Sequence, residues 1–165
     1  MTDLEIQRKE LIEHIRRVFP KKPRGKGKKG LKLVRGNHPV ESVRLRETFE
    51  GKSWEEAVSN PSVVYNLSDV DHLWEITDEA YRYYLPAFLV GTLLYPDHWV
   101  FYSLPFEKMS QMLSQFSADQ LDVLIAFFDF HARELAKETL VFGKDPFLEA
   151  IEDMQLRLML RRDEL

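Results

Sequence analysis

The chain of 165 residues contains no cysteine and no long uninterrupted hydrophobic run. Without cysteine, structural disulfides, thiolate zinc sites and cysteine nucleophiles are excluded, and a reducing compartment is favoured. The longest nearly apolar run, residues 85–95, has 11 residues and includes a proline, a glycine and a threonine, whereas a membrane-spanning helix needs about 20 apolar residues. Residues 1–17 mix both charges and lack the apolar block of a signal peptide. We therefore expect a soluble, cytoplasmic protein that does not contact membranes.

Charge is unevenly distributed along the chain. The net charge is −4, but residues 1–46 hold 14 basic and 5 acidic side chains, whereas residues 47–165 hold 9 basic and 22 acidic ones. The basic excess is concentrated in residues 21–35, KKPRGKGKKGLKLVR, with eight cations and no acid. A segment of this kind can attract anions or dock on an acidic surface.

The hydrophobic pattern predicts helices along most of the chain. Apolar residues at helical spacing, S/T-x-x-E/Q capping boxes and helix-ending prolines and glycines mark their bounds. The predicted helices cover residues 3–19, 39 or 41 to 49, a short stretch from 54, 78–95, 105–116, 118–137 and from 146 onward. Pro86 lies inside the fourth of these, so we expect either a kink or two helices joined at Leu85.

These elements predict a mainly α fold: one compact helical domain of about six helices over residues 1–165. Prolines and glycines make residues 20–38 a flexible basic loop. A small β element is expected near residues 31–34 or 62–76; the second stretch contains several β-branched residues, although it lacks a clean alternation.

Three pieces of the sequence resemble a family of uncharacterised bacterial proteins known only as a domain of unknown function. They are AYRYYLPAFL at residues 80–89, ETFEGKSWEE around Trp54, and QFSADQLDVLIAFFDF at residues 115–130, where Ala118 replaces the family's proline. The resemblance spans about residues 1–135 and does not include the basic loop. It implies no catalytic residues. Some members of the family lie near immunity-type genes of bacterial toxin systems, which implies binding to another protein.

Aromatic residues are concentrated in one region, since ten of the 20 lie between residues 74 and 106. They either fill a helical core or supply anchors for a partner, because tyrosine and tryptophan combine contact area with a polar end. Tyr83 and Tyr84 are adjacent and point to different sides of a helix, so we expect at most one of them to be fully buried. The candidate partner-binding residues are Trp74, Tyr83, Tyr84, Trp99 and Tyr102.

The basic segment contains a G-x-G-x-x-G pattern at residues 25–30. No buried strand precedes it and no helix follows it, so neither a dinucleotide fingerprint nor a P-loop is indicated. The segment is either a solvated loop or a site for nucleic acid and other anions, whose phosphates mobile cations can neutralise. The candidate anion-binding residues are Lys21, Lys22, Arg24, Lys26, Lys28, Lys29, Lys32 and Arg35.

The sequence identifies no catalytic or metal-binding apparatus. Asp69, Asp71 and His72 fall in one expected loop, Asp97-His98 fall in another, and His131 with Glu134 share a helix face. Each group has fewer than the three convergent ligands of a catalytic zinc, or is explained by turn formation. We therefore expect no metal, no cofactor and no catalytic residues, although an enzyme without a recognisable motif stays open.

Together these observations favour a non-enzymatic bacterial protein that binds another protein, with an immunity-like or regulatory role. The alternative is a protein that binds nucleic acid or an anionic ligand through residues 21–35.

Overall fold

The computed structural model describes residues 1–21, 32–33, 39–59, 76–96, 106–143 and 146–165. Within these ranges the chain forms seven α-helices and one short 3-10 helix, and no strand. The described part of the protein is therefore all-α, which confirms the predicted mainly α fold. Its helices group into two compact units, residues 1–105 and 106–165. A single domain over residues 1–165 stays a prediction.

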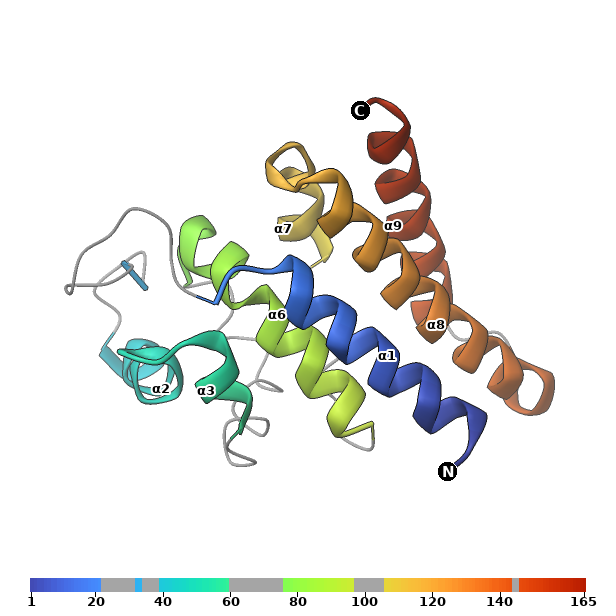
Figure 1. Ribbon diagram of the computed structural model, residues 1–165, viewed down its shortest axis with the longest axis horizontal. Coiled ribbons are helices and arrows are strands. Elements are labelled where there is room, and N and C mark those ends of the chain that lie inside the picture. Colours follow the sequence, from blue (N-terminus) through green and yellow to red (C-terminus); the bar gives the residue numbers. More distant parts are fainter. Residues whose placement is uncertain (22–31, 34–38, 60–75, 97–105, 144–145) are drawn as a thin grey trace. The chain divides into compact units, whose positions relative to one another are not determined.

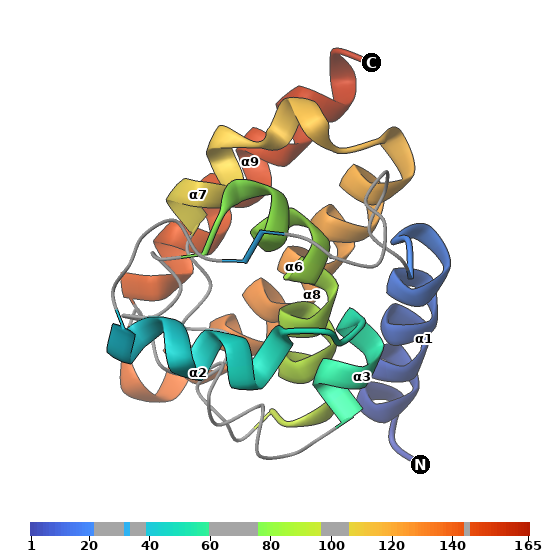
Figure 2. The ribbon, with the colours of Figure 1, turned by 90° about the vertical axis from the view of Figure 1, so that its left-hand side faces the viewer.

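The first unit contains four described helices. They are α1 (Asp3–Val18), α2 (Pro39–Phe49), α3 (Trp54–Ser59) and α6 (Asp78–Leu94). Helices α1 and α3 both pack against α6, and Figures 1 and 2 show the three side by side. Their buried side chains make the core of this unit, with Ile15, Trp54 and Leu85 fully enclosed.

Local sequence signals set the ends of α1. The Thr2 hydroxyl accepts a hydrogen bond from the Glu5 N–H at 3.2 Å, and the Glu5 carboxylate accepts one from the Thr2 N–H at 2.7 Å. This reciprocal capping box satisfies two N–H groups that the first turn leaves without helical partners. The helix ends where Phe19 becomes extended, because the following Pro20 disfavours helical dihedrals at that residue. Both predicted ends are confirmed to within one residue.

Helix α6 is the most deeply buried element of the first unit. Every residue from Tyr83 to Leu93 is buried, which fits the nearly continuous apolar sequence of this stretch. Pro86 lies inside one continuous helix, so the alternative of two helices joined at Leu85 is wrong. A proline in a helix interior costs about 3 kcal/mol, and the burial of apolar side chains on all sides of α6 offsets that cost.

The predicted β element is reduced to a single bridge residue in the described part of the chain. Ile76 is that residue, and the adjacent Thr77 N–H donates to the Leu33 carbonyl at 2.9 Å. Ile76 ends one of the two expected locations, and its residues 62–75, like residues 31 and 34 of the other, lie outside the described residues. The contact joins Leu33 of the basic segment to the start of α6.

The second unit contains α7 (Phe106–Gln111), a 3-10 helix at Leu113–Gln115, α8 (Ala118–Phe142) and α9 (Pro146–Asp163). The helix predicted over residues 105–116 is thus shorter than expected, and its last turn is tightened to 3-10 geometry. Ser117 and Gln120 form the predicted capping box of α8, with both hydrogen bonds between 3.1 and 3.2 Å. Gly143, at a φ of 86°, follows the end of α8, because glycine adopts left-handed dihedrals without steric cost.

Helices α8 and α9 pack against each other and form the core of the second unit (Figure 2). Each helix carries an apolar stripe at helical spacing. Ile125 and Ala132 of the α8 stripe and Phe147 of the α9 stripe are half-buried. The buried members of both stripes are Leu121, Leu124, Phe128, Leu135, Leu148, Ile151, Met154 and Leu158.

Replacing Thr77 by valine tests how α6 is started. The Thr77 hydroxyl accepts from the Ala80 N–H at 3.2 Å and donates to the Lys32 carbonyl at 2.5 Å. Valine keeps the shape and loses both bonds, so we expect Thr77→Val to lower the free energy of unfolding by about 1–3 kcal/mol. Urea denaturation measures this loss, and Thr77→Ser serves as the control that keeps the hydroxyl. Equal stability of the valine and wild-type proteins would contradict the assignment.

Candidate functional site

The structure describes two of the five aromatic residues proposed to bind a partner. Tyr83 and Tyr84 both lie on α6, whereas Trp74, Trp99 and Tyr102 lie outside the described residues. Tyr83 is 8% exposed and Tyr84 is 5% exposed. The expectation that one of the two would face solvent is therefore wrong, and neither ring is available as a surface anchor.

The Tyr84 hydroxyl lies within hydrogen-bond distance of two main-chain carbonyls. It donates to Phe49 at 2.8 Å and to Lys52 at 2.6 Å, sharing its one proton between them. Its ring also contacts the Phe49 ring, with centroids 4.3 Å apart. Tyr84 thus fixes the chain between α2 and α3. Burial raises the pKa of its phenol well above the ordinary value, because the phenolate would lose its hydration.

Tyr83 makes an equivalent contact with another segment of the chain. Its hydroxyl donates to the Lys21 carbonyl at 2.7 Å, and its ring meets the Tyr84 ring edge-on at 4.8 Å between centroids. Burial is also the main cause that raises the pKa of Tyr83. In both tyrosines the ring is buried and the hydroxyl finds a hydrogen-bond acceptor close by. Adjacent residues on α6 therefore bind two chain segments that lie far apart in the sequence.

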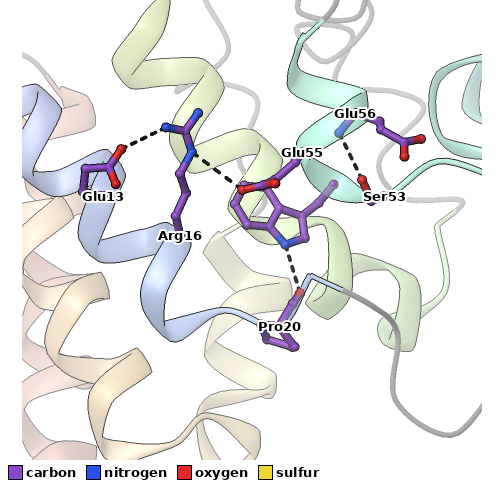
Figure 3. Close-up of polar contacts among 7 residues, drawn as sticks. Glu13, Arg16, Pro20, Ser53, Glu55 and Glu56 are labelled. Atoms are coloured by element: carbon purple, nitrogen blue, oxygen red, sulfur yellow. Dashed lines mark hydrogen bonds and ion pairs between the residues drawn. The ribbon is translucent and has the colours of Figure 1, made fainter.

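The chain on both sides of residues 22–31, the central part of the basic segment, is bound to the first unit through its main-chain carbonyls. The Trp54 indole N–H donates to the Pro20 carbonyl at 2.9 Å (Figure 3), next to the Tyr83–Lys21 bond. On the other side, Thr77 binds the carbonyls of Lys32 and Leu33. These four bonds fix the chain directly before and directly after residues 22–31.

Two of the eight candidate anion-binding residues are described. The side chains of Lys21 and Lys32 are both exposed, while their carbonyls bind the helical body. The other six, which lie outside the described residues, are Lys22, Arg24, Lys26, Lys28, Lys29 and Arg35. The structure therefore positions a cation at each end of the segment.

Charged side chains also connect α1 to α3. Arg16 donates to the Glu13 carboxylate at 3.0 Å and lies 3.7 Å from the Glu55 carboxylate, as Figure 3 shows. All three side chains are at least one-third exposed, so each pair contributes less than about 1 kcal/mol. The contact orients the two helices near Trp54 and forms no cleft of opposed carboxylates.

No group of three potential metal ligands gathers anywhere in the described part of the chain. His131 and Glu134 are half-buried neighbours on α8, and the His131 ring packs edge-on against the rings of Phe127 and Phe130. Asp69, Asp71, His72, Asp97 and His98 lie outside the described residues. His131 is thus a packing residue at the edge of the core of the second unit.

The sequence interpretation missed an apolar patch on α9, which we call the α9 ridge. Leu156, Met159 and Leu160 are 55%, 48% and 58% exposed, and they project from the side opposite the stripe that packs on α8. Their spacing of three and four residues places them within one turn. The signal was present in the sequence QLRLMLRR, but only the core stripe of α9 was assigned from it.

Acidic side chains frame the α9 ridge at both ends. Glu152 and Asp153 precede it, and Asp163 and Glu164 follow it, all four exposed. The nearby arginines form ion pairs with carboxylates: Arg157 donates to Asp153 at 2.8 Å and Arg161 donates to Glu164 at 2.9 Å. Arg162 donates two hydrogen bonds to the Asp122 carboxylate of α8, at 2.7 and 3.3 Å. This contact raises the pKa of the Arg162 guanidinium. The ridge is therefore apolar at its centre and has two carboxylates at each end, of which Asp153 and Glu164 are paired with arginines.

Comparison with known proteins identifies no relative of this chain: no family model, no curated protein and no solved structure matches it. The resemblance carried by residues 80–89 stays a prediction. Among the described helices, none combines the length and apolar character that crossing a membrane requires.

Replacing Tyr84 by phenylalanine tests its anchoring role. Two carbonyls lose their donor, so we expect Tyr84→Phe to lower the free energy of unfolding by about 1–3 kcal/mol at neutral pH. Because the folded-state pKa of Tyr84 is raised, folding favours the protonated phenol. Its contribution is fully present below the unfolded pKa of about 10 and is lost as pH rises above it. Above about pH 10, the stability of Tyr84→Phe should therefore fall less steeply than that of the wild type, as urea denaturation at several pH values will show. Parallel curves would contradict the role.

Proposed function

We propose that this chain is a non-enzymatic binding protein that docks a partner protein with a basic surface on the α9 ridge. The single observation that carries the proposal is the clustering of exposed apolar residues. Eight large apolar side chains are exposed in the described residues, and three of them lie within one turn of α9. Single exposed apolar residues are ordinary, whereas a contiguous patch marks an interaction surface.

Charge supports a basic partner. The second unit, residues 106–165, holds 12 acidic and 7 basic residues and therefore has a net charge of −5. The ridge itself is bordered by exposed carboxylates at both ends. Such a field accelerates the approach of a cationic surface and disfavours an anionic one. Desolvated apolar contacts at the centre then supply most of the binding free energy.

A triple substitution on the ridge tests this function. Leu156→Gln, Met159→Gln and Leu160→Gln remove apolar surface without touching the α8–α9 core, so we expect the variant to fold with unchanged or slightly higher stability. Its affinity for a partner that wild-type protein binds should fall at least tenfold, because about 4 kcal/mol of apolar burial is lost. The measurement is quantitative pull-down from the native host followed by titration with the retained protein.

The matched control for this test is Val43→Gln, which replaces an apolar side chain, 50% exposed, that lies on α2 outside the α9 ridge. It should bind like the wild type. A triple variant that folds and retains every partner at wild-type affinity would rule out the ridge as the binding surface.

A second candidate function is binding of a phosphate-bearing polymer through residues 21–35. The observation that favours it is the attachment of the chain at Pro20, Lys21 and Lys32 by Trp54, Tyr83 and Thr77. In the sequence, seven of the eight cations lie at or between these attached residues.

Salt titration of a mixed-sequence DNA duplex tests this second candidate. Each phosphate neutralised should contribute about −0.9 to the slope of log K against log salt concentration. The variant Lys26→Ala, Lys28→Ala, Lys29→Ala should bind at least tenfold more weakly and with a slope reduced by up to about 3. Lys137→Ala, an exposed lysine of α8, is the control. Unchanged affinity of the triple variant would remove this candidate.

A further inference from the structure

We infer that the element received by the α9 ridge is an amphipathic α-helix of the partner, with apolar residues at i, i+3 or i+4, and i+7, and with lysines or arginines flanking that stripe. This inference rests on the proposed function and specifies the partner of the same surface. The geometry and the charges of α9 each contribute to it.

The shape of the surface favours a helix over other elements. The ridge is a convex row of side chains three and four residues apart, and such rows interlock with the equivalent rows of another helix. An extended peptide would need the open edge of a sheet for its main-chain hydrogen bonds, and the described residues contain no strand. Helix-on-helix packing is therefore the recognition mode that this face can support.

The separation of the carboxylates at the two ends of the α9 ridge sets the length of the partner helix. The span from Glu152 to Glu164 covers 13 residues of chain, which is about 18 Å at 1.5 Å per residue. A partner helix of about 15 residues, or four turns, would cover the ridge and reach the carboxylates at both of its ends. Its central apolar residues would bury Leu156, Met159 and Leu160.

Charge disfavours a second copy of α9 as the occupant. An antiparallel pair centred on the ridge would place Asp153 of one copy near Asp163 of the other, and Glu152 near Glu164. A parallel pair would place each of these carboxylates beside its own equivalent. Like charges in such positions destabilise a helix pair. A helix with cations at both ends of its apolar stripe would instead place opposite charges beside the carboxylates at the two ends of the α9 ridge.

Two labelled probe peptides test the inference on the full chain. Each is a 15-residue amphipathic helix with the same leucine stripe, flanked by lysines in one and by glutamates in the other. Fluorescence anisotropy should show binding of the lysine probe, and at least tenfold weaker binding of the glutamate probe. The triple glutamine variant of the ridge should lose at least tenfold in affinity for the lysine probe, and Val43→Gln should lose none. The variant Glu152→Lys, Asp163→Lys should reduce its affinity about fivefold or more, with stronger binding of the glutamate probe.

The other outcomes overturn the inference in distinguishable ways. Equal binding of both probes, abolished by the triple variant, would disprove the cationic requirement and leave the ridge as a docking surface. Lysine-probe binding that the triple variant retains would disprove both the inference and the proposed function. No binding of either probe by a chain that sedimentation velocity shows to be dimeric, and that the triple variant turns monomeric, would make a second copy the occupant. No binding by a monomeric chain would disprove the helical partner.

Discussion

The structure of the first unit depends on the need of two buried tyrosine hydroxyls for hydrogen-bond partners. A hydroxyl buried without a partner costs on the order of 1–3 kcal/mol, so the chain must bring acceptors to Tyr83 and Tyr84. It does so with main-chain carbonyls of Lys21, Phe49 and Lys52. The core helix α6 thereby determines where the chain after α1 and the chain between α2 and α3 must run. The start of the basic segment is fixed as a consequence of core packing.

The second unit presents a different problem, because α9 is apolar on two faces. A helix that is apolar on all sides is normally buried, yet α9 covers only one of its faces with α8. The exposed carboxylates around Leu156, Met159 and Leu160 resolve this conflict. Under the proposed function, they disfavour pairing with a second copy of the same face, in the way that charged residues protect exposed apolar segments from self-association.

Much of this fold could be predicted from the sequence because its signals are local. The capping boxes at Thr2 and Ser117, the proline after Phe19 and the apolar spacing on α8 and α9 each act within one or two turns. Tyr83 and Tyr84 could not be placed correctly, because the argument that adjacent residues face opposite sides assumes a helix with one exposed side. Helix α6 is enclosed on all sides, which only tertiary packing decides. The alternative of two helices joined at Leu85 was wrong for the same reason, since the burial that offsets the cost of Pro86 is not visible in the local sequence.

The ridge was missed because a stripe of leucines on a terminal helix is normally assigned to the core. Its meaning emerges when the charges are considered together with the fold. The cations of the chain are concentrated before residue 47, and the acids are concentrated after it. The second unit therefore carries a negative field around its exposed apolar turn, and that field attracts cationic surfaces while repelling phosphates. In the second candidate function, the cations of residues 21–35 would have the opposite preference. Under the proposed function, a partner that uses the α9 ridge brings positive charges that complement the net charge of −5 of the second unit.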